Sequence, residues 1–334
     1  MKAVVAREPG RLAVETVPDP TPGPGQLVLR VSACGICGTD TRMHQMGLIP
    51  PGTILGHEFC GEVAESRHGH KAGDRVCALP SISCGECGRC RSGLGAYCSS
   101  RKTIGFGASN GAFAEYVAVA AHETVRLPEG VDSTLGALVE PLAVGLHAVN
   151  VGRIRRGETC LVIGAGPVGL ATALWARHFG AGMVIVSEIA PARRALAERM
   201  GATTSLDPRA AGLDSRLAEL APEGPDVVFE AVGEPGVIRE AIGRARFRGR
   251  VVVAGLCFSA DTIEPLAATS KEVSVSFVLS YEKDDFQYTV DMMEQERIAP
   301  RPIVTDRIGL DDVPEAFRAL AKPDSQCKVV VCPS

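Results

Sequence analysis

Residues 160–169 read Cys-Leu-Val-Ile-Gly-Ala-Gly-Pro-Val-Gly, an apolar run that leads directly into glycines spaced Gly-x-Gly-x-x-Gly. The run predicts a buried strand, and residues 169–179 predict a helix after it. Glycines between a strand and a helix let backbone N–H groups and the helix N-terminus approach a pyrophosphate. We therefore expect a dinucleotide to bind at this turn, which contains Gly164, Gly166, Pro167, Val168 and Gly169.

Downstream, strand and helix patterns alternate. Apolar strands are expected at 183–187, 226–230 and 251–255, and a second helix at 192–200. Continuous apolar strands between helices are typical of a parallel sheet covered on both faces. The sequence predicts an α/β protein with a doubly wound parallel sheet.

Glu188 follows the second of these strands, nineteen residues after Gly169. A carboxylate in this place accepts hydrogen bonds from the adenosine ribose hydroxyls and repels a 2′-phosphate. NAD is therefore the expected cofactor. Arg193 and Arg194 keep NADP open, and the alternative for Glu188 is an ordinary surface charge at a strand end.

The first 140 residues or so have a different character. Short apolar runs, such as 26–33 and 114–120, are separated by turns rich in glycine and proline, which indicates β-structure. An apolar helix is expected over 133–151, with Asp132 or Ser133 as its N-cap. The last part of the chain predicts helices at 284–296 and 313–320 and a final strand at 328–332.

Four cysteines form the most specific pattern, Cys-x2-Cys-x2-Cys-x7-Cys. Four thiolates within fifteen residues match a closed, tetrahedral zinc site that stabilises a loop and leaves no position for substrate. An iron–sulfur cluster is the alternative for four thiolates. We expect a structural zinc bound by Cys84, Cys87, Cys90 and Cys98.

A second metal site is expected upstream. A catalytic zinc needs three protein ligands and one open position. Cys37 lies in a glycine-rich segment, and His57 and Glu58 are adjacent, so these three are the candidates. Glu140 is a further candidate, because a bare carboxylate in so apolar a stretch would be costly without a metal. Its alternative is a helix residue paired with an arginine.

Composition excludes several classes of function. The 334 residues carry a net charge of −4 and only 4% aromatic side chains, so a nucleic-acid surface is not expected. The N-terminus lacks the pattern of a signal peptide, and the longest apolar run, 160–176, is too short to span a bilayer. We expect a cytoplasmic protein, in which twelve cysteines indicate metal binding rather than disulfides.

Together these residues resemble the medium-chain, zinc-dependent alcohol dehydrogenase family along essentially the whole chain. The pair His57-Glu58 and the segment Glu140-Pro141-Leu142 resemble the polyol, threonine and butanediol dehydrogenase branch, and the segment 280–286 is similar to butanediol dehydrogenases. The other markers are Cys37-Gly38-Thr39-Asp40, Gly73-Asp74-Arg75-Val76, Gly111-Ala112-Phe113-Ala114-Glu115-Tyr116, the four cysteines and the glycine turn.

The resemblance implies two domains. A GroES-like, β-rich catalytic domain would comprise residues 1–147 and 281–334, with the structural zinc lobe at about 80–100. A Rossmann domain that binds NAD would comprise 148–280. By the same resemblance, Val168, Glu188 and Arg193 contact the cofactor.

The resemblance also implies roles in a catalytic site. Cys37, His57 and Glu58 would hold the zinc, Glu140 would bind the metal or its water, and Asp40 would orient His57. Thr39 would pass the alcohol proton outward. Many relatives end this relay on a histidine where this chain has Arg42. The chain has His44 two positions later, which would replace that histidine unless it is an exposed loop residue.

The expected activity is oxidation of a secondary alcohol to a ketone, with hydride transfer to NAD. A polyol, diol, amino alcohol or cyclitol suits the carboxylate-rich site. The same site would also serve a ketone reductase that uses NADPH, and a non-catalytic, dinucleotide-binding zinc protein is the alternative outside enzymes. A homo-dimer or homo-tetramer is expected, with the apolar segment 273–279 pairing across an interface.

Overall fold

The computed structural model describes residues 1–320 and 325–333, which form two compact units. The first unit comprises Met1–Glu140, Tyr281–Glu296 and the chain from Val304 onward, and the second comprises Pro141–Ser280 and Arg297–Ile303. The division therefore falls at the start of helix α4 (Val139–Gly152), whereas the boundary expected from sequence, 147/148, falls inside this helix.

The second unit is built on a six-stranded parallel sheet with the strand order β12-β11-β10-β13-β14-β15. This order is that of a Rossmann fold, in which the chain starts in the middle of the sheet and winds outward both ways. The predicted α/β class with a parallel sheet is confirmed. The strands are β10 (Thr159–Ile163), β11 (Met183–Ser187), β12 (Thr204–Leu206), β13 (Val227–Glu230), β14 (Arg250–Val253) and β15 (Ser274–Phe277).

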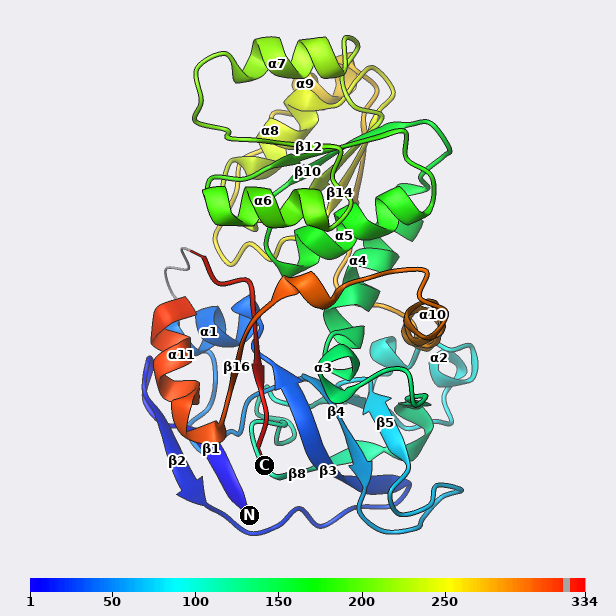
Figure 1. Cartoon of the computed structure of the whole chain (residues 1–334), viewed down its shortest axis with the longest axis vertical. Coiled ribbons are helices and arrows are strands. Elements are labelled where there is room, and N and C mark those ends of the chain that lie inside the picture. The colour runs from blue at the N-terminus through cyan, green and yellow to red at the C-terminus, as the bar shows by residue number, and fades with distance from the viewer. Residues whose placement is uncertain (321–324, 334) are drawn as a thin grey trace. The chain divides into compact units, whose positions relative to one another are not determined.

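Helices cover both faces of this sheet, with α5 and α6 on one face and α8 and α9 on the other (Figure 1). The α8 face buries Leu161, Ile185 and Val228. On α5 lies Trp175, whose ring is completely buried and whose Nε1 donates to the carbonyl oxygen of Leu142 at 2.9 Å. The helices are α5 (Pro167–His178), α6 (Pro191–Arg199), α7 (Leu213–Leu220), α8 (Val237–Arg244) and α9 (Pro265–Ser270).

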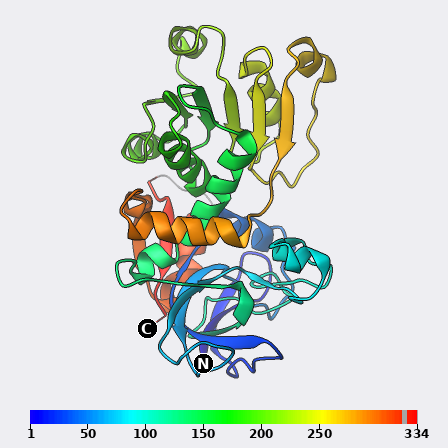
Figure 2. The same cartoon turned by 90° about the vertical axis from the view of Figure 1, so that its right-hand side faces the viewer.

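The first unit contains a strongly bent, mostly antiparallel sheet in the order β16-β17-β3-β4-β5-β9, with β8 also paired to β3 (Figure 2). Its core includes Phe59, Phe113 and Phe317. The long strand β3 lies within the sheet and pairs with three strands, β17, β4 and β8. The strands are β3 (Gln26–Gly35), β4 (Glu58–Val63), β5 (Arg75–Ala78), β8 (Tyr116–Ala120), β9 (Thr124–Arg126), β16 (Val304–Ile308) and β17 (Lys328–Val331).

Smaller elements complete this unit. Two further antiparallel pairs are β1 (Lys2–Ala6) with β2 (Leu12–Thr16), and β6 (Ser81–Ile82) with β7 (Lys102–Thr103). The helices are α1 (Gly38–Gln45), α2 (Gly88–Arg91), α3 (Ser133–Gly136), α10 (Lys283–Glu294) and α11 (Val313–Leu320).

Two expectations about local structure were wrong. The helix predicted over 133–151 is two helices, α3 and α4, although its N-cap is Asp132 as expected, with Oδ1 accepting from the N–H of Leu135 at 2.9 Å. The apolar, strand-like runs around six other cysteines predict core thiols: Cys60, Cys77, Cys160, Cys257, Cys327 and Cys332. Cys257 and Cys332 are instead partly exposed, since they follow β14 and β17 and do not lie within them. The core positions predicted for Cys60, Cys77, Cys160 and Cys327 are confirmed.

Across the described ranges, 1–320 and 325–333, we find no helix with the length and apolar character needed to cross a membrane.

Candidate active site and zinc lobe

The four cysteines of the lobe converge on one point. Cys87 caps α2, Cys90 lies within it, and Cys98 ends a 3-10 turn at Gly95–Tyr97. The Sγ atoms of Cys87 and Cys90 are 3.4 Å apart, those of Cys84 and Cys98 3.6 Å, and those of Cys84 and Cys90 3.8 Å. A tetrahedral zinc with bonds of about 2.3 Å separates its sulfurs by about 3.8 Å, so this group fits the ion.

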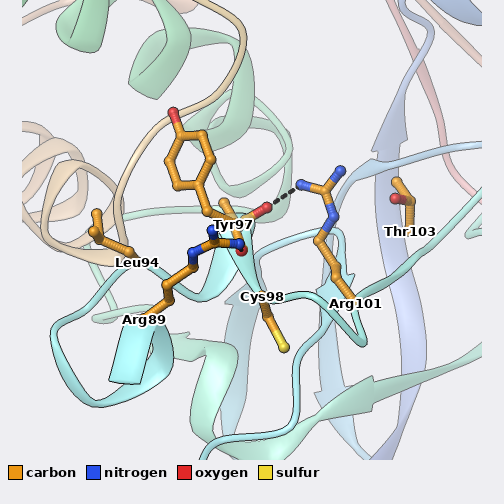
Figure 3. A pocket seen from close by; sticks show the side chains of 7 residues that line it. Arg89, Leu94, Tyr97, Cys98, Arg101 and Thr103 are labelled. Carbon is orange, nitrogen blue, oxygen red and sulfur yellow. Dashed lines mark hydrogen bonds between the residues drawn. The ribbon is translucent and has the colours of Figure 1, made fainter. Parts of the chain in front are cut away.

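Local hydrogen bonds favour the thiolate at two of the four cysteines, whereas burial raises the pKa of Cys90 to about 11. The Ser100 hydroxyl and backbone groups lower the pKa of Cys98 to about 6, and backbone N–H groups lower the pKa of Cys84. A pocket of about 570 Å³ borders the lobe, lined by Arg89, Leu94, Ala96, Tyr97, Cys98, Arg101 and Thr103 (Figure 3). Arg89 donates to the carbonyl oxygen of Tyr97 at 2.7 Å, so this arginine stiffens the turn that carries Cys98.

A second group of donors lies at the start of α1 and β4. The ligand atoms of Cys37, His57 and Glu58 all lie within 4.8 Å of one another. Cys37 is the N-cap of α1, and its Sγ accepts from the N–H of Thr39 at 3.4 Å. Glu58 opens β4 opposite Gly35. Thiolate, imidazole and carboxylate are the ligands that zinc takes in proteins, so these residues fit a metal site.

Asp40 forms hydrogen bonds with two residues of this group, His57 and Cys37. Its side chain is fully buried, Oδ1 lies 3.1 Å from Nδ1 of His57, and Oδ2 accepts from the N–H of Cys37 at 3.4 Å. Burial opposes a charge on His57, but the Asp40 carboxylate outweighs it and raises the pKa of His57 well above its usual value. With Nδ1 bound to Asp40, the other ring nitrogen, Nε2, remains for a metal.

Glu140 lies near this group on the first turn of α4 and is 8% exposed. Burial raises the pKa of Glu140 to about 7, against the field of His57, and the hydroxyl of Tyr281 donates to its Oε1 at 2.7 Å. The predicted alternative of a pairing with an arginine is therefore wrong, because the partner is a tyrosine. Glu140 does not belong to the tight donor group of Cys37, His57 and Glu58.

Three further residues at this site escaped sequence reasoning. Lys328 is fully buried, and its ammonium contacts both carboxylate oxygens of Glu58. Tyr281 binds Glu140, and the ring of Phe106 lies 4.8 Å from that of His57. A lysine at the head of the apolar run 328–331 was the one available signal, because a charge beside a buried strand needs a partner.

The proposed relay residues lie in different surroundings. Thr39 is partly exposed and is two residues from Cys37. His44 is 3% exposed and packs edge-on against Phe317 at 6.5 Å, so the alternative of an exposed loop histidine is wrong. Its Nε2 has no hydrogen-bond partner, and burial lowers the pKa of His44.

The glycine turn of the second unit has the backbone geometry that its motif requires. Gly164 has φ +98°, in the left-handed region, and a Cβ there would lie 2.8 Å from Cγ2 of Val232. A Cβ on Gly169 would overlap the carbonyl oxygen of Gly164, so this glycine lets α5 pack closely on β10. Gly166 has open space around it and is the N-cap of α5, which begins with Pro167 and Val168.

The Glu188 carboxylate is hydrogen-bonded to the backbone of this turn. It is 7% exposed, with Oε2 accepting from the N–H of Ala165 at 2.8 Å and Oε1 from that of Ala190 at 2.9 Å. Arg194 donates to the backbone oxygen of Glu188 at 2.8 Å and pairs with Asp207, whereas Arg193 is partly exposed on α6. Glu188 is thus a built part of the turn and not a loose surface charge.

Comparisons with known proteins agree with this architecture. Residues 23–129 match the alcohol dehydrogenase GroES-like domain, and residues 167–295 match the zinc-binding dehydrogenase family. The chain is 32% identical to (R,R)-butanediol dehydrogenase of Bacillus subtilis, with 100% of both chains covered. It is 31% identical to L-threonine 3-dehydrogenase of Klebsiella pneumoniae, with 92% of this chain and 93% of the relative covered.

Solved structures are similar over the same length. A zinc-binding dehydrogenase of Sinorhizobium meliloti, bound to NADP, is 34% identical, with a TM-score of 0.90 and 99% of both chains covered. An alcohol dehydrogenase of Escherichia coli, complexed with NADH, is 26% identical, with a TM-score of 0.91 and 99% of both chains covered.

Proposed function

The chain belongs to the zinc-dependent medium-chain dehydrogenase family and is an NAD(P)-dependent alcohol dehydrogenase; from this we propose that it oxidises a polar secondary alcohol to a ketone. A polyol, diol, amino alcohol or cyclitol is the proposed substrate class, and NAD the proposed acceptor. The membership also rules out the non-catalytic zinc protein considered from the sequence.

One observation carries the substrate class. Beside the donor group lie two buried, hydrogen-bonded pairs, Glu140 with Tyr281 and Glu58 with Lys328. The Glu140 carboxylate and the Tyr281 hydroxyl oxygen can accept a further hydrogen bond from a second hydroxyl or an amine on the substrate, which a purely apolar alcohol could not offer. Relatives act on butanediol and threonine, which carry a second polar group next to the alcohol.

Cys37, His57 and Glu58 would hold a zinc ion, which would supply Lewis-acid chemistry at the alcohol oxygen, and a bound nicotinamide would supply the hydride acceptor. Asp40 keeps the His57 ring in place through its bond to Nδ1. Glu140 is proposed to bind the metal or its water, with its Oε1 held by the Tyr281 hydroxyl. The Thr39 hydroxyl is proposed to accept the alcohol proton and pass it toward solvent. His44 is proposed as the residue that receives the proton from Thr39.

The cofactor is proposed to lie on the turn from Gly164 to Gly169, with Val168 and Arg193 in contact and Glu188 accepting from the adenosine ribose. A second candidate is ketone reduction with NADPH. It is favoured by the NADP bound in the Sinorhizobium relative.

The test is a panel of polyols, diols, amino alcohols and cyclitols with NAD and NADP, followed by NADH or NADPH absorbance. We expect a diol or related polar alcohol to give the highest kcat/KM, with two zinc ions per chain by elemental analysis. Cys37→Ser should lose one zinc and all turnover, while the variant Cys257→Ser, outside both donor groups, keeps both. Full activity of Cys37→Ser would refute the proposed site, and a preference for long apolar alcohols would refute the substrate class.

A further inference from the structure

Lys328 is a buried charge of the first unit that contacts the donor group and has no step of its own in the proposed reaction. It opens β17, is completely buried, and binds a residue 270 positions away in sequence. Burying an ammonium costs several kcal/mol unless its N–H groups are satisfied. Its Nζ lies 2.6 and 2.5 Å from the two carboxylate oxygens of Glu58 and 3.0 Å from the carbonyl oxygen of Ile36, so all three N–H groups are used.

The surrounding backbone leaves room for this pair and no more. Gly35 lies opposite Glu58 in the β3–β4 pairing. A Cβ on Gly35 would overlap Oε2 of Glu58 and lie 3.2 Å from Cδ of Lys328. Gly35 does not have a positive φ, so the space, and not the backbone conformation, requires a glycine here. The N–H of Ile36 donates to the oxygen of Val329 at 2.9 Å, which fixes β17 beside the segment that leads to Cys37.

This arrangement connects Lys328 to two of the three donor residues. A carboxylate oxygen has two lone pairs, so Glu58 can bind Lys328 with one and still offer the other to a metal. The same ammonium binds Ile36, which directly precedes Cys37. Its positive charge also offsets the repulsion between the Cys37 thiolate and the nearby carboxylates.

We propose that Lys328 is a positioning residue of the metal site, which orients the Glu58 carboxylate for the metal and anchors the backbone that carries Cys37. This inference rests on the zinc site of the proposed function. Hydrogen-bonding partners of metal ligands typically contribute a factor of about 10–100 to metal affinity or activity. An ion pair that only fastened the last strand would change the stability of the fold and leave the metal site as it was.

The test replaces Lys328 with methionine and measures metal binding directly. Cobalt(II) is loaded into the Cys37 site, its absorption bands are recorded, and zinc affinity is measured by competition with a chelator. We expect Lys328→Met to change the cobalt bands and to weaken metal binding about 10–100-fold, because the carboxylate is no longer oriented. Lys2→Met is the matched control, since Lys2 forms an exposed pair with Asp311 at 2.7 Å in the same unit.

A double-variant comparison decides whether Lys328 acts through Glu58. In a Glu58→Gln background, adding Lys328→Met should have little further effect on metal affinity and kcat/KM. Equal effects in both backgrounds, or unchanged cobalt bands and affinity in Lys328→Met, would overturn the inference. If Lys328→Met does not fold, Gly35→Ala displaces the Glu58 oxygen with both charges retained, and unchanged cobalt bands in that variant overturn it as well.

The two proposals fail in different ways. A wild-type chain that binds one metal ion and oxidises no alcohol contradicts the proposed function. A wild-type chain that binds two and is active, together with an unaffected Lys328→Met, contradicts only the role of Lys328.

Discussion

Glu140 is buried beside other charged groups, and its ionisation is therefore linked to folding. Its pKa is about 7 in the folded chain, against 4.5 for an ordinary glutamate, and burial is the main cause. A carboxyl group whose pKa rises on folding binds more protons in the folded state between these two values. In the metal-free protein, stability is therefore lost as the pH rises from about 4.5 to about 7, and the loss levels off above that range.

We expect Glu140→Gln to remove this pH dependence from the metal-free protein. The shift corresponds to about 3 kcal/mol of unfolding free energy, because one pKa unit is about 1.4 kcal/mol. Urea unfolding at pH 5 and pH 8 measures the difference. Glu62→Gln is the control, since Glu62 lies in an exposed pair with Arg30. The same change in unfolding free energy between pH 5 and pH 8 in wild type and in Glu140→Gln would contradict the prediction.

A second prediction for a single residue concerns Glu188 and the binding of the cofactor. Glu188→Ser removes the carboxylate that accepts from Ala165 and Ala190 and that is proposed to bind the ribose. We expect KM for NAD to rise about tenfold or more, since a hydrogen bond to a charged group contributes about 1.5–3 kcal/mol. Activity with NADP should rise relative to NAD, because the repulsion of a 2′-phosphate is lost.

Steady-state kinetics with both cofactors measure this change. Glu198→Gln is the matched control, because Glu198 is an exposed carboxylate on α6 that binds the Ser205 hydroxyl at 2.9 Å. An unchanged ratio of NAD to NADP activity in Glu188→Ser would mean that this carboxylate serves only the backbone of the turn.

At the residue scale, the sequence predicted donors better than it predicted their partners. Cys37, His57 and Glu58 stand next to glycines or to each other, so short-range pattern was sufficient to select them. Lys328 and Tyr281 reach their carboxylates across 270 and 141 positions, and only the folded sheet brings them there. Long-range partners of this kind leave almost no local signal.

At the scale of elements, the zinc lobe is the clearest case of a segment that a metal would hold together. Residues 84–98 contain one short helix, one 3-10 turn and several exposed positions, so few apolar contacts fix their shape. A structural zinc supplies the missing stabilisation in such loops. The lobe also contacts the rest of the first unit through the Ser83 hydroxyl, 2.7 Å from Nε2 of His122.

We expect Cys98→Ser to lose the lobe metal and to lower the melting temperature by about 5 °C or more, at about 2–4 °C per kcal/mol. Elemental analysis and calorimetry measure the two effects. Cys257→Ser is the control, because Cys257 is partly exposed, lies outside both donor groups, and its Sγ donates to the oxygen of Ser259 at 3.3 Å. A Cys98→Ser protein with two zinc ions and an unchanged melting temperature would show that the lobe does not depend on its fourth thiolate.

Secondary structure was predictable where one pattern dominated. The strand 183–187 and the helix 313–320 agree with β11 and α11 residue for residue, because the first is a short continuous apolar run and the second has apolar residues at helical spacing. The helix expected over 133–151 is interrupted at Ala137 and Leu138, which are completely buried. Pro141 accounts for the interruption, because it has no N–H to donate to the carbonyl oxygen of Ala137 and is tolerated only in the first turn of a helix. The sequence thus contained this signal, which the apolar pattern outweighed in our prediction.

At the scale of the whole molecule, β15 is an edge strand of the six-stranded sheet and carries exposed apolar side chains. β15 pairs with β14 on one side, and Phe277 and Leu279 beside it are 67% and 66% exposed. Unpaired N–H and C=O groups next to exposed apolar side chains favour pairing with another strand. We expect two copies of the chain to associate through β15.

Light scattering after size exclusion tests this expectation. The wild type should have the mass of a dimer or tetramer, and Phe277→Lys should reduce it, because a lysine at an edge disfavours strand pairing. Leu266→Lys is the control, since Leu266 on α9 is 78% exposed and lies outside the strand. A monomeric wild type at high concentration would contradict the prediction.

The chain contains one tryptophan, and its position gives the molecule a built-in optical reporter. Trp175 is enclosed in the core of the second unit, on the helix that starts at the glycine turn. Its emission should lie at short wavelength in the native protein and move to longer wavelength when that unit opens. Fluorescence therefore follows the second unit alone, while circular dichroism averages over both. Where the two signals change at different denaturant concentrations, the units unfold separately.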